Sequence, residues 1–307
     1  MIEGQEGVSW DEWVALARAC EESGLEGLFR SDHYQSVFGI QGRAALDAWG
    51  TTIALGAVTE RIRLGTMVSP ATFRRPSVLA RLVATADHVS GGRVELGLGA
   101  GWNVVEHEAY GFPFPELGER MEILEEQLEI IHRQWTEDEF SFEGRHYRLE
   151  QSRAEPKPVQ KPHPPVILGG HAGPRAARLA ARWADEYNTA FATPDDCRAA
   201  KARIDEACAK AGRDPIPFSL MIPCAVGRDA AEAQERAQRR LGRIGVTDHP
   251  ATLGGDDDKL IGTVEDVVAR LEEYAGAGVE RVFLQHLDHA DLEMVHLIGA
   301  EIVPAIA

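Results

Sequence analysis

An acid and an imidazole stand side by side at Asp32-His33, directly after the apolar run at residues 25–30. A histidine exchanges its proton near neutral pH, so His33 could act as a general acid or base. The adjacent carboxylate could hydrogen-bond the ring edge of a cofactor. A structural role is the equally weighted alternative, because such pairs also occur where no chemistry takes place.

Gly169 and Gly170 end another apolar run, and Pro174 suits the first turn of the helix that follows. Backbone N–H groups at a helix N-terminus attract phosphate, and the helix dipole adds to the attraction. The loop at residues 169–173 is therefore predicted to bind a phosphate group. The alternative is that the two glycines only permit a tight turn.

A third glycine segment, Gly97-Leu98-Gly99-Ala100-Gly101, lacks the G-x-G-x-x-G spacing of a dinucleotide site, so a Rossmann fold is rejected. Small residues at alternate positions leave one face of a strand without side chains, and a flat ring could lie there. Close backbone packing is the alternative.

His286 and His289 have no third ligand at a sensible spacing, so we expect no metal site.

The elements that must position these residues alternate between short apolar runs and amphipathic stretches with helical spacing. Strands are predicted at residues 25–30, 62–69, 93–100, 165–169, 185–190, 218–226 and 279–286. Helices are predicted at residues 9–23, 44–59, 77–90, 120–135, 174–183, 194–211, 230–244, 264–277 and 291–302. This alternation indicates a parallel sheet covered by helices, with the candidate residues at the carboxyl ends of strands, which is the working face of an α/β barrel.

A length of 307 residues allows a single (β/α)8 TIM-type barrel domain over residues 1–307. Only residues 1–4 are left to form the eighth strand, so we expect a short first strand whose start is clipped. Alternation around Glu143-Gly144 predicts a β-hairpin inserted after the fourth helix. The polar, glycine-rich residues 245–260 are predicted to form a mobile lid.

The formal net charge of −17 disfavours binding to nucleic acid or to an anionic membrane surface. Apolar runs such as residues 94–98 are too short to span a bilayer, and the first residues do not resemble a signal peptide. We therefore expect a cytoplasmic protein that acts on a small molecule. The cysteines have no C-x-x-C pairing and are predicted to be reduced packing residues; they are Cys20, Cys197, Cys208 and Cys224.

Several motifs, taken in order, resemble those of the bacterial luciferase-like family of flavin- and deazaflavin-dependent (β/α)8 oxidoreductases, over essentially the whole chain. The motifs are LFRSDH at residues 28–33, RLGTMV at 63–68, FRRP at 73–76, GGRVELGLGAGW at 91–102, PVILGG at 165–170 and GTVEDV at 262–267. Each motif is weak by itself, and their shared order makes the resemblance specific. The residues of these motifs are more similar to those of the branch that uses coenzyme F420 than to those of the aerobic flavin monooxygenases.

The resemblance implies a flavin-like ring across the barrel mouth, with its phosphate end at the 169–173 loop and a cis peptide at Met67–Val68 behind the ring. It implies that Asp32 contacts the ring edge and that His33 is the catalytic residue, which assists proton transfer. The residues implied to bind the cofactor are Asp32, Thr66, Met67, Val68, Ala100, Gly101, Asn103, Gly169, Gly170, His171 and Ala172.

The implied activity is hydride transfer between coenzyme F420 and a small organic substrate, and we expect a homodimer. The alternatives are an FMN-dependent monooxygenase that uses reduced flavin and O2, with a flavin reductase as partner, and a flavin-binding barrel without catalysis. Sugar-phosphate dehydrogenases of the F420 branch carry a catalytic acid just after the fourth strand, where this chain has Trp102-Asn103. That specific activity is therefore not expected. Glu106 and Tyr110 could enter the pocket, although their spacing is also that of a packed helix face.

Overall fold

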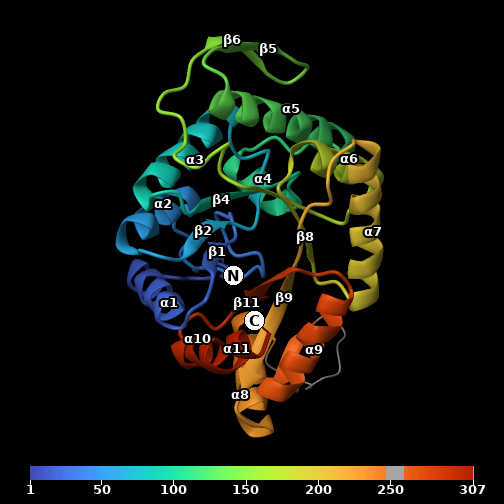
Figure 1. The fold of residues 1–307 in the computed structure, drawn as a ribbon. Coiled ribbons are helices and arrows are strands. Elements are labelled where there is room, and N and C mark those ends of the chain that lie inside the picture. Colours follow the sequence, from blue (N-terminus) through green and yellow to red (C-terminus); the bar gives the residue numbers. More distant parts are fainter. Residues whose placement is uncertain (247–258, 307) are drawn as a thin grey trace.

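Parallel strands surrounded by helices make up the computed structural model, which describes residues 1–246 and 259–306 (Figure 1). The strands are β1 (Gly27–Arg30), β2 (Arg63–Thr66), β3 (Ser69–Pro70), β4 (Val94–Gly99), β7 (Val166–Gly169), β8 (Glu186–Ala190), β9 (Phe218–Gly227), β10 (Leu260–Thr263) and β11 (Arg281–Gln285). They run in the order β1-β2-β4-β7-β8-β9, with β3 beside β4 and with β10 and β11 beside β9. All of these pairs are parallel, which confirms the predicted α/β class.

Met1 and Ile2 join the two ends of this strand order. The Ile2 N–H donates to the Phe29 carbonyl over 2.9 Å, and the Met1 ammonium donates to the Leu284 carbonyl over 2.8 Å. The His286 N–H donates to the Met1 carbonyl over 2.9 Å. These bonds link β1 to β11 in the (β/α)8 arrangement that the sequence predicts, and the first strand is as short as expected.

The helices follow the predicted positions closely. They are α1 (Trp10–Glu22), α2 (Ala48–Val58), α3 (Pro76–Ser90), α4 (Val104–Tyr110), α5 (Leu117–Thr136), α6 (Pro174–Trp183), α7 (Pro194–Lys210), α8 (Ala230–Arg243), α9 (Val264–Gly276), α10 (Leu292–Leu297), a π-helix (Ile298–Ile302) and α11 (Val303–Ile306). Capping boxes at Ser9, Thr193 and Thr263 start α1, α7 and α9. Across residues 1–246 and 259–306, every helix is too short or too polar to cross a bilayer.

The structure differs from the predicted elements at three places. The expected strand at residues 62–69 is divided into β2 and β3 at the Met67–Val68 peptide, which is cis as predicted. Helix α4 and strand β10 were not predicted. The hairpin is confirmed: β5 (Phe140–Glu143) and β6 (Arg148–Ser152) are antiparallel and project beyond α5 (Figure 1). Residues 247–258 of the predicted lid lie outside the described residues.

Side chains fill the barrel interior in two chemically distinct layers. An apolar cluster includes Phe29, Met67, Ile167, Met221 and Phe283. At the amino ends of the strands, the guanidinium of Arg281 lies against the rings of Phe29 and Phe283 and pairs with the carboxylates of Glu95 (2.8 Å) and Glu186 (3.1 Å). The interior is therefore a packed apolar core that ends, at the amino ends of the strands, in the ion pairs of Arg281 with Glu95 and Glu186. The four cysteines are buried and free, as predicted.

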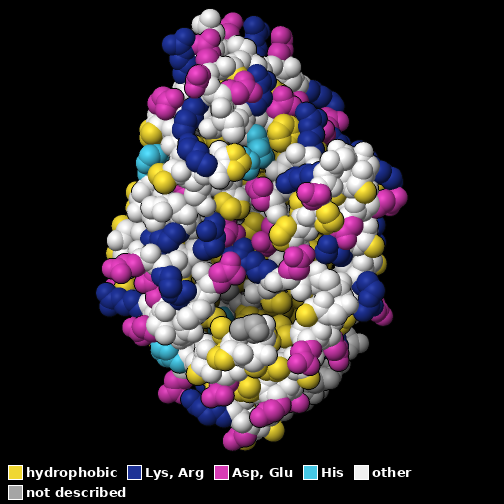
Figure 2. Space-filling view, in the orientation of Figure 1, with side chains coloured by type: hydrophobic (Ala, Val, Ile, Leu, Met, Phe, Trp, Pro, Cys, Tyr) yellow, Lys and Arg dark blue, Asp and Glu magenta, His cyan; other side chains and the backbone are white. Residues whose placement is uncertain are grey.

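An apolar cavity of about 620 Å³ lies beside Met1, between β1 and β11. Leu28, Leu284 and Ile298 are among its lining residues, and Figure 2 shows a hollow with hydrophobic side chains in this part of the molecule. The lining also includes residues 24–27 and 279–281, which precede or begin the two strands, so the cavity extends toward the amino ends. It is therefore away from the carboxyl ends where the candidate residues lie.

The alternating glycines of β4 allow close approach of neighbouring backbone. A Cβ atom at Gly97 would lie 1.9 Å from the Thr66 carbonyl oxygen, and one at Gly99 would lie 2.9 Å from the Val68 side chain. A Cβ atom at Gly169 would also meet Val68, at 3.0 Å. The face that the sequence predicts to be bare is thus covered by Thr66 and Val68. This finding supports the packing interpretation for Gly97 and Gly99 and corrects the expectation that a ring lies directly on them.

We predict that Gly97→Ala destabilises the protein by about 3 kcal/mol or more, because the strand pair must separate to admit the methyl group. Gly118→Ala is the matched control, since Gly118 lies in α5 with nothing within 4 Å of a Cβ atom. The control should be neutral or stabilising by up to about 1 kcal/mol. Urea unfolding followed by circular dichroism measures both changes, and equal effects in the two variants would contradict the packing argument.

Candidate active site

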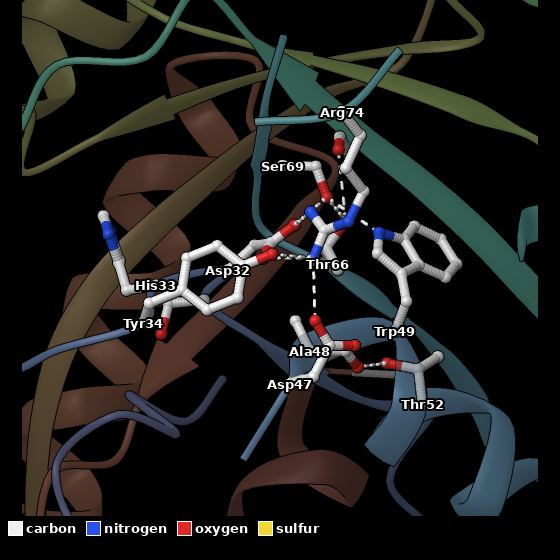
Figure 3. Close-up of polar contacts among 12 residues, drawn as sticks. Asp32, His33, Tyr34, Asp47, Ala48, Trp49, Thr52, Thr66, Ser69 and Arg74 are labelled. Carbon is white, nitrogen blue, oxygen red and sulfur yellow. Dashed lines mark hydrogen bonds and ion pairs between the residues drawn. The ribbon is translucent and has the colours of Figure 1, made fainter. Parts of the chain in front are cut away.

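A buried ion pair lies at the carboxyl ends of β1 and β3 (Figure 3). The Arg74 guanidinium donates to both carboxylate oxygens of Asp32, over 2.5 and 3.1 Å, and the Ser69 hydroxyl donates to the same carboxylate over 2.6 Å. Arg74 also binds the Asp47 carboxylate at the start of α2 and the Tyr34 hydroxyl, over 3.1 and 3.0 Å. The ion pair therefore connects β1, β3, α2 and the segment that leads into α3.

The Asp32 carboxylate already has protein partners on both oxygens. The Asp32 side chain is 1% exposed. Burial alone would lower the pKa of Arg74, but the Asp32 charge and hydrogen bonds raise it, so the guanidinium stays charged. In this arrangement Asp32 positions Arg74 and Ser69. Oδ1 of Asp32 accepts a single hydrogen bond, from Arg74, so it keeps one acceptor position for the expected contact with a ring edge.

His33 forms a second pair with a residue of α4. Its Nδ1 lies 2.6 Å from a carboxylate oxygen of Glu106, which is fully buried and also accepts the Tyr34 N–H. Burial alone would lower the pKa of His33, but the hydrogen bond and charge of Glu106 raise it above the ordinary value. No described residue hydrogen-bonds Nε2, so that nitrogen is available to a substrate. The pair can hold a proton and present it at the barrel mouth.

Aromatic packing holds α4 against the loop after β1. The ring of Tyr34 stacks on that of Tyr110 at 5.1 Å and lies 5.3 Å from that of Phe73. The Tyr110 hydroxyl donates to the Tyr34 carbonyl over 2.9 Å. Trp102 lies edge-on to the His33 ring, with centroids 5.7 Å apart. These contacts fix Glu106 relative to His33, although the two residues are 73 positions apart in the chain.

The loop after β7 offers fewer free N–H groups than the sequence analysis assumed. The Gly170 N–H donates to the Asn188 carbonyl over 3.0 Å, and the N–H of the fully buried Ala172 donates to the Tyr187 hydroxyl over 2.7 Å. Helix α6 begins after Gly173 with no side-chain cap, and nothing lies within 4 Å of a Cβ atom at Gly173. The uncapped first turn of α6 therefore fits a phosphate group better than Ala172 does.

The remaining predicted residues lie around the same strand ends. Val68 is adjacent to Gly99 and Gly169, which brings the segment after β2 into contact with β4 and β7. Ala100, Gly101 and Asn103 are partly exposed after β4, and Gly170 and His171 are exposed after β7. Thr66 is fully buried, and its hydroxyl donates to the Gly97 carbonyl over 3.1 Å and lies 3.1 Å from the Ser69 hydroxyl, which joins it to the network around Asp32. Ser69 and Arg74 were not among the predicted site residues, although Arg74 lies in the FRRP motif and Ser69 directly follows the RLGTMV motif.

The family described as "Luciferase-like monooxygenase" matches residues 2–281. An F420-dependent glucose-6-phosphate dehydrogenase of Microbacterium testaceum is 36% identical over 235 residues, which cover 74% of this chain and 68% of that protein. An FMNH2-dependent dimethylsulfone monooxygenase of Pseudomonas putida is 28% identical over 298 residues, which cover 96% of this chain and 78% of that protein.

Solved structures of other enzymes share this fold. The coenzyme F420-dependent tetrahydromethanopterin reductase of Methanopyrus kandleri superimposes with a TM-score of 0.83 and 20% sequence identity. The match covers 100% of this chain and 98% of that one. At this identity, the similarity establishes the architecture only.

We predict that Asp32→Asn lowers the free energy of unfolding by about 3 kcal/mol, because the substitution removes the buried carboxylate that pairs with Arg74 and leaves that arginine only the exposed Asp47. Asp47→Asn is the matched control: Asp47 also binds Arg74, but its side chain is 48% exposed, and asparagine can still cap α2. The control should change stability by less than about 1 kcal/mol. Urea unfolding of both variants measures the change. If Asp32→Asn lowers the free energy of unfolding no more than Asp47→Asn does, the buried ion pair does not hold these segments together.

Proposed function

Because the chain belongs to the luciferase-like monooxygenase family, we propose that it is an oxidoreductase that transfers a hydride between coenzyme F420 and a small organic substrate. Members of this family include F420-dependent dehydrogenases and FMN-dependent monooxygenases. The preference for F420 is supported by the higher identity to an F420-dependent relative, 36% against 28%.

The observation that carries the proposal is the His33–Glu106 pair. Reduction of a carbonyl group consumes one proton for each hydride, and a buried imidazole held by a carboxylate can supply that proton. Glu106 holds Nδ1, so Nε2 is the atom that would deliver the proton. Coenzyme F420, when bound, supplies or accepts the hydride. His33 is therefore the proposed catalytic residue, and Glu106 is a positioning residue that keeps it protonated and oriented.

Other residues would hold the cofactor. Val68 and Ala100 lie at the carboxyl ends of β2 and β4, where they can support a flat ring, and the first turn of α6 can bind a phosphate group through its N–H groups. Met67, Ile167 and Met221 form an apolar floor inside the barrel. This floor would exclude water from the lower side of the ring, which protects a hydride donor.

A second candidate function is FMN-dependent monooxygenation. It is favoured by the monooxygenase of Pseudomonas putida, which matches 96% of this chain. Equilibrium titration of the purified protein with F420 and with FMN, followed by fluorescence quenching, distinguishes the two proposals. Tighter binding of F420 supports hydride transfer, whereas tighter binding of reduced FMN, with O2-dependent turnover, supports monooxygenation. Binding of either cofactor without turnover of any substrate would indicate a non-catalytic barrel.

We predict that Gly173→Asp weakens F420 binding at least tenfold, or about 1.4 kcal/mol, because the new carboxylate caps α6 and repels the phosphate group. The extended backbone of Gly173 suits an N-cap side chain, so stability should stay unchanged or rise slightly. Gly173→Asn is the control that adds the cap without the charge, and it should weaken binding less. Unchanged affinity in the aspartate variant would mean that this loop is only a tight turn.

We predict that His33→Ala lowers kcat for F420-dependent carbonyl reduction by about 10² to 10⁴-fold, while the F420 dissociation constant changes less than about threefold. The rate of the parent protein should fall as pH rises through the raised pKa of His33, because the protonated imidazole is the proton donor. Glu106→Gln removes the carboxylate that raises this pKa, so the descending limb should move to lower pH.

Kinetics between pH 5 and 9 test both parts of this prediction. His88→Ala is the control, since His88 lies on the outer helix α3 and contacts the Lys157 carbonyl. A pH limb that persists in His33→Ala, or one that does not move in Glu106→Gln, contradicts the assignment.

A further inference from the structure

Large apolar side chains face solvent at the carboxyl-end rim of the barrel. Trp102, three residues after the end of β4, is 64% exposed, and Phe191, directly after β8, is 50% exposed. Val105 and Tyr110 of α4 are also exposed. Exposed apolar groups that gather beside a catalytic group are typical of a binding surface.

Trp102 and Phe191 follow strands that are two places apart in the sheet. In the order β4-β7-β8, the ends of β4 and β8 are separated by two strand spacings, or about 10 Å, a span that one small molecule can bridge. The indole of Trp102 is edge-on to the His33 ring at 5.7 Å. Phe191 has a φ of 52°, a backbone conformation that is uncommon for a phenylalanine, and its N–H donates to the Met221 carbonyl over 3.0 Å. The chain therefore holds this ring in an exposed position at a cost in backbone energy.

Carboxylates offset positive charge beside His33 and Trp102. Arg43 pairs with Glu6 and Arg74 pairs with Asp32, whereas Arg120 donates to the neutral Gly101 carbonyl. In α4, Glu106 and His107 are buried, and the exposed charged residue is the acidic Glu108. A phosphate group on the substrate would find apolar rings and a negative charge here.

We infer that the substrate is an uncharged, largely apolar carbonyl compound, or the corresponding alcohol, whose body packs against Trp102 and Phe191. This inference rests on the proposed F420-dependent function and names its substrate class. In the reduction, the C=O double bond becomes a C–H and an O–H bond. The hydride and its two electrons come from reduced F420, which becomes oxidised, and the proton on oxygen comes from His33. Trp102 and Phe191 are specificity residues and take no part in the bond changes.

The test compares cyclohexanone with glucose 6-phosphate, using the protein loaded with F420. We expect kcat/KM for cyclohexanone with reduced F420 to exceed that for glucose 6-phosphate, assayed with oxidised F420, by at least about 100-fold. Trp102→Ala should raise both KM and the calorimetric dissociation constant for cyclohexanone about tenfold, and Phe191→Ala should act in the same direction. The F420 dissociation constant should change less than about threefold in both variants.

Trp10→Ala is the matched control, because Trp10 is an exposed indole at the start of the outer helix α1. It should leave unchanged the KM for cyclohexanone and the dissociation constants of cyclohexanone and F420. The inference is overturned if the protein turns over glucose 6-phosphate in preference to cyclohexanone, or if Trp102→Ala binds cyclohexanone as tightly as the parent. If F420 binding is intact in these experiments, the proposed function still holds. Loss of a dimer in Trp102→Ala by sedimentation, with unchanged cyclohexanone binding, would instead identify the surface as a contact between two copies and also overturns it. Failure of the parent protein to bind F420 overturns the proposed function and this inference together.

Discussion

The bidentate bond between Arg74 and Asp32 is the interaction on which the geometry of the barrel mouth depends. It buries opposite charges where β1 and β3 end, and through Asp47 it also reaches the start of α2. A buried ion pair contributes little net stability when it is complete, but it is costly to break, so it specifies one arrangement of these segments. With the backbone at Asp32 fixed, the next residue, His33, is placed against Glu106 of α4. Asp32 therefore acts indirectly, by fixing the position of His33.

Two adjacent residues thus have opposite environments and separate tasks. Asp32 bonds to Arg74 and Ser69, whereas His33 bonds to Glu106 and lies beside the exposed indole of Trp102. The Asp32 carboxylate is paired with Arg74, and the Glu106 carboxylate is paired with His33. The charge of Glu106 therefore favours a protonated imidazole at His33, although Trp102 presents an apolar surface beside it. The glycines of β4 complete the arrangement by letting Thr66 and Val68 approach closely.

Local signals in the sequence predicted most of the fold, and long-range contacts account for what they missed. The capping box at Thr193 and the Pro174 start of α6 are encoded within a few residues, so the helix positions were predictable. Helix α4 has seven residues and little apolar periodicity, and it was missed. The strand pattern placed His33 just after the strand that the structure shows as β1, but its bond to Glu106 depends on packing across 73 residues. The glycines of β4 allowed two interpretations, and the positions of Thr66 and Val68 in the folded chain distinguish them.

Closure of the barrel by Met1 has a consequence for how the protein folds as it is synthesised. The bond between Met1 and the Leu284 carbonyl joins positions 283 residues apart, so it cannot form until β11 has left the ribosome. Until then, the Met1–Ile2 segment that pairs with β1 has no partner on its other side, and the apolar cluster that contains Phe29 lacks Phe283. Contacts of such high sequence separation slow folding and expose apolar surface to aggregation and to chaperones. Nascent chains that stop before β11 are therefore open sheets, and the barrel is completed only by its last strand.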